Sequence, residues 1–85
     1  MSVRLLLAGG GEAVLLALTG ESVRITSSAV APPGARLEAA LEKDGAVRLR
    51  FKVHSARRLE DGTYLLEGRP LDLTRQTRER IAGLL

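Results

Sequence analysis

The chain is 85 residues long, holds no cysteine and carries a formal net charge of +3, from 13 Lys and Arg against 10 Asp and Glu. Its length allows one small domain, residues 1–85, and an apolar content of 45% excludes an intrinsically disordered chain. The lack of cysteine excludes a disulfide framework, a thiolate nucleophile and a cysteine-ligated zinc, and so mild a charge does not by itself indicate a nucleic-acid binder.

Turn residues recur at short intervals along the chain, which is typical of an all-β sandwich or barrel. We predict a hairpin of strands 3–8 and 13–18 over three successive glycines, followed by strands 22–26, 47–54 and 63–69. The turn signals between these strands are Gly9-Gly10-Gly11, Thr19-Gly20, Pro32-Pro33-Gly34, Asp44-Gly45 and Asp61-Gly62.

The segment 36–42 fits either a helix or a strand. Its residues are good helix formers, yet apolar and polar residues also alternate along it. A three-residue loop, Lys43-Asp44-Gly45 in a type I turn with a left-handed glycine, would place Leu37 opposite Phe51 inside a barrel. A two-residue loop would instead set leucines opposite arginines. We therefore predict a strand over 36–42.

The chain is predicted to end in a helix. Thr74 is a suitable N-cap, and Thr77, Ile81, Leu84 and Leu85 fall near one face of the segment that follows. Because a single helix with a narrow apolar stripe is stable only when it docks, we expect Ile81, Leu84 and Leu85 to cover one end of the barrel.

No apolar run approaches the ~18 residues that span a bilayer, because Glu12 and three glycines interrupt the N-terminal stretch. We therefore expect no signal peptide, no membrane span and a cytoplasmic protein.

The single histidine, His54, has no metal-ligand companion, and nothing assembles a nucleophile, a base and an oxyanion donor. We expect a non-enzyme with no catalytic residue, no metal and no cofactor.

The chain resembles a PilZ domain over residues 3–85. The resemblance is carried by "RRLEDGTYLLEGRPLDL" and "RERIAGLL", and by "APPGARLEAAL" before them. In that family an Asp-Gly-x-Tyr turn, a strand, Leu-Asp-Leu and a closing Arg-x-Arg-Ile-x-x-Leu-Leu helix follow one another in the same order. Glu67 and Pro70 depart from it, because they stand where the family usually has glycine and an aromatic residue. The resemblance implies a small antiparallel six-stranded β-barrel with a C-terminal α-helix.

Typical PilZ domains bind cyclic dimeric GMP through two motifs. One is a pair of arginines with three residues between them, on an arm before the first strand; this chain begins two residues before that strand, and Arg4 is alone within it. The other is Asp/Asn-x-Ser-x-x-Gly, which falls on "ALTGES". There Ala17 replaces the acid, Thr19 keeps a hydroxyl and Ser22 replaces the glycine. We therefore expect no nucleotide binding at these positions.

One face of the strand 47–54 is basic. Arg48, Arg50, Lys52 and His54 alternate there with Val47, Leu49, Phe51 and Val53, which are predicted to point inward. Our candidates for partner binding are the four polar residues of this face together with Arg24, which is predicted to point outward from the strand 22–26. The simpler explanation is a solvated face, with Glu38 opposite Arg50 and with Glu42 nearby as a further cross-strand partner.

The resemblance and the altered motif together predict an adaptor or regulatory domain. It would bind an unidentified protein partner in cyclic dimeric GMP, pilus or surface-motility signalling. Two alternatives stay open: a small basic β-barrel that binds nucleic acid through the 48–54 face, and a cyclic dimeric GMP receptor that uses non-consensus residues. Nucleic acid is the less favoured partner because the chain has only two aromatic residues, Phe51 and Tyr64, to stack on bases. The sequence leaves the oligomeric state open.

Overall fold

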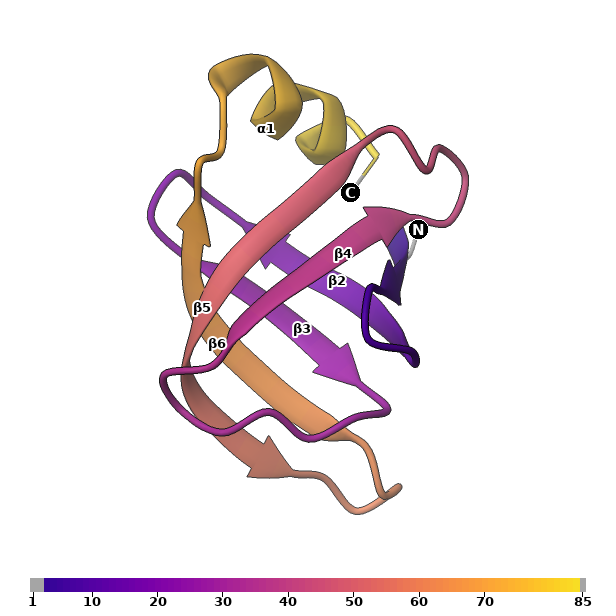
Figure 1. Ribbon diagram of the computed structural model, residues 1–85, viewed down its shortest axis with the longest axis vertical. Coiled ribbons are helices and arrows are strands. Elements are labelled where there is room, and N and C mark those ends of the chain that lie inside the picture. The colour runs from indigo at the N-terminus through magenta and orange to yellow at the C-terminus, as the bar shows by residue number, and fades with distance from the viewer. Residues whose placement is uncertain (1–2, 85) are drawn as a thin grey trace.

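Six short strands and one helix make up most of residues 3–84, which the computed structural model describes (Figure 1). The strands are β1 (Val3–Leu7), β2 (Glu12–Leu18), β3 (Val23–Ser27), β4 (Arg36–Leu41), β5 (Arg48–Arg58) and β6 (Tyr64–Leu71), and the helix is α1 (Arg75–Ala82). Neighbouring strands are antiparallel in the order β1-β2-β3-β6-β5-β4, and β4 pairs with β1. The sheet thereby closes into a barrel, which confirms the predicted fold.

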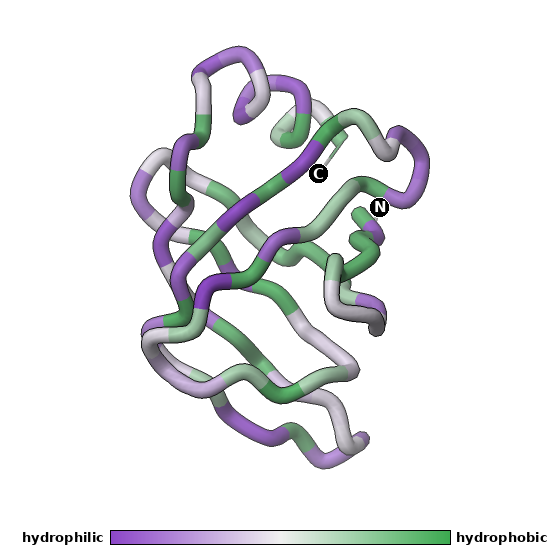
Figure 2. Tube along the Cα trace, in the orientation of Figure 1, coloured by the Kyte–Doolittle hydropathy of each residue, from purple (hydrophilic) through white to green (hydrophobic). Residues whose placement is uncertain are grey.

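The alternation of apolar and polar residues places every second side chain inside the barrel. In Figure 2, hydrophobic and hydrophilic residues alternate along β5. Phe51 and Val53 of β5, Ile25 of β3 and Leu66 of β6 are completely buried. Because closure leaves no free strand edge, a partner of the barrel has to be recognised by exterior side chains, loops or the helix.

The segment predicted as a strand over 36–42 is β4, and its register with β5 is the predicted one. Leu37 lies opposite Phe51, and Glu38 lies opposite Arg50. The pairing of apolar residues inside the barrel therefore outweighs the helix propensity of this segment.

The turn that connects β4 and β5 differs from the predicted three-residue loop. Gly45 does not adopt a positive φ. Among the described glycines, a positive φ occurs only at Gly10, Gly11, Gly34 and Gly62. Instead Asp44 organises the turn: its Oδ1 accepts from the backbone N–H of Ala46 at 3.1 Å, and its carbonyl oxygen accepts from that of Val47 at 3.0 Å. An aspartate side chain that bonds two residues ahead makes a turn of its own, so the left-handed glycine is not needed.

Helix α1 begins after Thr74, as predicted. The Thr74 side chain accepts from the backbone N–H of Thr77 at 3.1 Å, which satisfies one free donor of the first turn. Ile81 is completely buried and joins the barrel core, and Leu73 is packed against that core just before the helix. With eight residues α1 is short, and within residues 3–84 no helix is long and apolar enough to cross a membrane.

The apolar face of α1 is narrower than predicted. Leu84 is 38% exposed, so the prediction that it covers the barrel end is wrong, and Leu85 lies outside the described residues. The helix ends at Ala82, one residue past the buried Ile81, so Leu84 does not continue the helical face that reaches the core. Ile81 is therefore the one large apolar side chain of α1 that is completely buried.

Candidate binding surface on the barrel exterior

The turn between β2 and β3, where the resemblance places the nucleotide motif, is hydrogen-bonded to itself. Thr19 Oγ1 accepts from the backbone N–H of Glu21 at 3.2 Å and of Ser22 at 2.9 Å, and it lies 3.1 Å from Ser22 Oγ. Thr19 N also donates to the Ser22 carbonyl oxygen at 2.8 Å. Nearby, Ala17 is exposed and offers only a methyl group. Both hydroxyls of the turn therefore hold the turn closed.

Helix α1 also touches this turn. A Cβ placed on Gly20 would come within 2.6 Å of an Arg78 guanidinium nitrogen, so the guanidinium lies directly against the turn. Arg78 is half-buried there. The C-terminal helix and the β2–β3 turn therefore meet at the same end of the barrel.

Beside the turn lies an open pocket of about 320 Å³ on the barrel exterior. It is lined by Ala17, Glu21, Ser22, Val23, Arg24, His54, Ser55, Glu67 and Gly68. Arg24 lies opposite Glu67, which lies opposite Ser55. The Arg24 guanidinium is 3.6 Å from the Glu67 carboxylate, so these two charges compensate each other. The pocket brings together Arg24 and His54, two candidates that the sequence placed on separate strands.

Two irregularities in the strand ladders shape the pocket. The register shifts after Leu15 in β2 and after Val53 in β5, and the second shift leaves His54 without a partner residue in β6. Close by, a Cβ at Gly68 would overlap the backbone carbonyl oxygen of Lys52. Only glycine fits where β6 approaches β5 so closely. The position of His54 at the pocket is therefore set by a bulge and not by simple alternation.

The predicted basic face of β5 divides into paired and unpaired cations. Arg48 lies 3.4 Å from Glu38, and Arg50 lies 3.3 Å from Asp72. Lys52 is exposed, and among residues 3–84 no carboxylate lies within 4.0 Å of its ammonium group. A solvated face with ion-pair partners therefore explains Arg48 and Arg50 but not Lys52.

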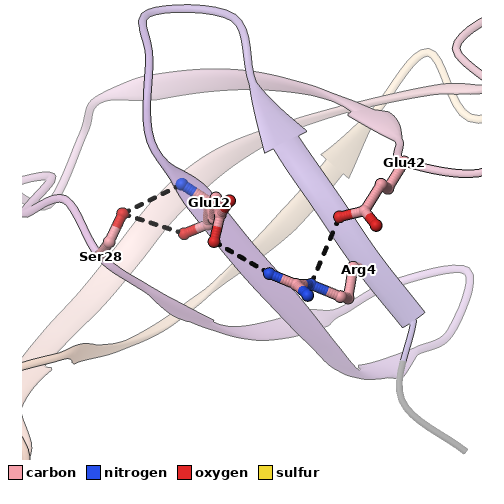
Figure 3. A network of polar contacts seen from close by, with 4 residues as sticks. All are labelled: Arg4, Glu12, Ser28 and Glu42. Atoms are coloured by element: carbon pink, nitrogen blue, oxygen red, sulfur yellow. Dashed lines mark hydrogen bonds and ion pairs between the residues drawn. The ribbon is translucent and has the colours of Figure 1, made fainter.

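Glu42, predicted as a partner for the β5 cations, lies elsewhere. Its carboxylate is 3.3 Å from Arg4 of β1, whose guanidinium is also 3.0 Å from Glu12 (Figure 3). Ser28 fixes this end of β2, because its Oγ accepts from Glu12 N at 3.0 Å. That prediction is wrong because barrel closure between β4 and β1 brings Arg4 to Glu42. The exterior cation of β1 is thus compensated from both sides.

A different arrangement occurs across β4, β5 and β6. Lys52 lies directly opposite Arg36 on one side and Arg69 on the other, and all three side chains are exposed. In the part of the chain that the structure describes, no carboxylate lies within 4.0 Å of any of the three. These three residues form the cation row. Like charges directly opposite each other destabilise a sheet, so the cation row is unfavourable for the chain on its own.

Of the three residues in the cation row, only Lys52 was a candidate from the sequence, and Arg36 and Arg69 were missed. The register that places Leu37 opposite Phe51 also places Arg36 opposite Lys52, so this neighbour could have been found from the sequence. Arg69 could not, because its place depends on the bulged pairing of β5 with β6.

No family model, curated protein or solved structure matches the chain. Among residues 3–84, no three histidine, aspartate or glutamate side chains lie together as a metal site requires. What the chain does therefore has to be inferred from its own turn, pocket and cation row.

Proposed function

We propose that the chain is a non-enzymatic adaptor or regulatory domain of the PilZ type that binds a protein partner in the cytoplasm. Its partner would act in cyclic dimeric GMP, pilus or surface-motility signalling, and the chain itself would not bind the dinucleotide. The closed six-stranded barrel with a C-terminal helix supports this assignment, because it is the architecture that the resemblance implies. The turn Asp61-Gly62, which is part of the resemblance, also lies between β5 and β6.

The observation that carries the proposal is the closed β2–β3 turn. Thr19 Oγ1 already accepts two backbone N–H groups, and Ala17 supplies no acceptor for a guanine edge. The neighbouring Arg24 guanidinium is occupied by Glu67. A dinucleotide would have to replace these contacts, which lowers the net gain from binding.

Binding to a protein is supported by the exterior of the barrel. Without an edge strand, the barrel cannot extend its sheet with a peptide, so recognition has to use side chains. The cation row presents three uncompensated charges on one face. Charges of one sign favour a partner of the opposite sign and raise its association rate.

Isothermal titration calorimetry tests the nucleotide part of the proposal. We expect no saturable heat when cyclic dimeric GMP is added to the full chain. The matched variant, Ala17→Asp with Ser22→Gly, restores the acid and the glycine of the motif and shows whether the turn is the limiting element. Saturable binding by the unaltered chain, with a micromolar or tighter dissociation constant, would overturn the proposal.

The protein part is tested by capture from a lysate of the source cells, followed by reconstitution of the complex from purified components. We expect a stable complex that survives nuclease treatment. A complex that nuclease dissolves, with an affinity that falls steeply with salt by a slope of about −0.7 per single-strand phosphate contact, would replace protein binding by nucleic-acid binding.

A further inference from the structure

The geometry of the cation row indicates the kind of partner segment it fits; this step rests on the proposed protein-binding function. Arg36, Lys52 and Arg69 occupy directly opposite positions on three neighbouring strands. Neighbouring strands lie about 4.8 Å apart, so the three side chains start along a line of about 10 Å that crosses the strands. The charge is therefore arranged across the sheet and not along one strand.

Compensated charges lie on both sides of the cation row. On one side, the next outward residue of β4 is Glu38, which is paired with Arg48. On the other side, the next outward residue of β6 is Glu67, which is paired with Arg24. The uncompensated charge is therefore narrow, and a long polyanion laid over the face would meet these carboxylates. A short segment with a few negative charges fits better.

We propose that the cation row binds three carboxylates on one face of an acidic α-helix of the protein partner, with the helix lying across β4, β5 and β6. Helical positions i, i+3 and i+7 share a face and span about 10.5 Å, close to the line of about 10 Å occupied by the three cations. Three same-face residues of an extended strand would span about 13 Å. The spacing therefore fits a helix better than an extended peptide.

The surroundings of the cation row also favour an acidic helix over a single-stranded nucleic acid. Phe51 is completely buried inside the barrel, and Tyr64 lies at the far end of β6, opposite Arg58. The row therefore has no aromatic side chain on which bases could stack, and stacking contributes much of single-strand binding.

The test uses a synthetic alanine-based peptide of about 20 residues, long enough to be helical alone, with glutamates at i, i+3 and i+7. Its binding to the full chain is measured by fluorescence anisotropy at about 0.1 M salt, where charges more than about 10 Å away are screened. The variant Arg36→Ala/Lys52→Ala/Arg69→Ala should bind about tenfold more weakly, since it loses three exposed ion pairs.

A matched variant and a matched peptide separate the geometry from net charge. Lys43→Ala/Arg57→Ala/Arg58→Ala removes three exposed charges outside the cation row and should weaken binding less than about twofold. A peptide of the same composition, with its glutamates spread around the helix, should bind clearly more weakly than the one-face peptide. Circular dichroism melts check that both variants are folded.

Three results of the peptide experiment would overturn the inference. They are failure of the unaltered chain to bind the one-face peptide, equal binding of both peptides, and equal losses in both triple variants. Tighter binding of a single-stranded oligonucleotide that also depends on the cation row would overturn it in favour of nucleic acid. The proposed function is tested independently of this inference, by calorimetry with the dinucleotide and by reconstitution of the native complex. If that complex forms equally well with the cation-row variant, only the cation row is excluded as its site.

Discussion

Replacing Lys52 by glutamate should stabilise the folded chain, although Lys52 is a residue that we place in a binding surface. It stands between Arg36 and Arg69, and no carboxylate of the described residues lies within 4.0 Å of it. In Lys52→Glu, two cross-strand repulsions become two attractions. Each cross-strand charge pair is worth about 0.2–1 kcal/mol, and exposure keeps these pairs near the lower end of that range. We expect the free energy of unfolding to rise by about 1 kcal/mol at low salt.

The assay is thermal unfolding followed by circular dichroism. For a chain of this size, 1 kcal/mol corresponds to a Tm shift of about 4–8 °C. Arg50→Glu is the matched control, because it makes the same charge change on the same strand but breaks the ion pair with Asp72 and faces Glu38. Its Tm should fall, and both shifts should shrink at 1 M salt, where the screening length is about 3 Å. A Tm of Lys52→Glu at or below that of the unaltered chain at low salt would refute the reasoning.

Other changes test the parts of the fold that frame this surface. Ile81→Ala should lower the free energy of unfolding by about 2–4 kcal/mol, because Ile81 is the completely buried side chain of α1. Urea titrations measure this loss, and a loss below about 1 kcal/mol would mean that the helix does not complete the core. Gly68→Ala should cost about 1–3 kcal/mol, since its Cβ overlaps a backbone carbonyl of β5, whereas Gly9→Ala, with no atom within 4 Å of its Cβ, should change little. The Thr63 hydroxyl and then the Thr63 backbone N–H hold the pKa of Asp61 below its ordinary value of 3.8. This stabilisation is present above pH 3.8 and is lost as the pH falls through the folded pKa, so Thr63→Val should flatten the fall of Tm in that acid range. An NMR titration that places the pKa of Asp61 at or above 3.8 would contradict this prediction.

Local patterns were sufficient to predict most elements of the barrel. The alternation over 47–54 predicted which side chains of β5 point inward, and Thr74 predicted where α1 begins. The strand 36–42 was predicted against its helix propensity, because only a strand pairs apolar residues inside. These features depend on residues close in sequence or within one hairpin. The exposure of Leu84 was missed, because the residue at which a helix ends depends on how it docks.

The candidate surface, by contrast, depends on contacts between distant segments of the chain. Arg69 lies beside Lys52 only because β6 pairs with β5 across a bulge after Val53, and no periodicity in the sequence marks that bulge. Glu42 compensates Arg4 and not a cation of β5, because the barrel closes between β4 and β1. Alternation tells which charged side chains face water, since burial of a charge is costly everywhere in the chain. Which of those charges find a partner is decided by the closed barrel, because an ion pair needs two groups within about 4 Å and only the tertiary fold sets that distance.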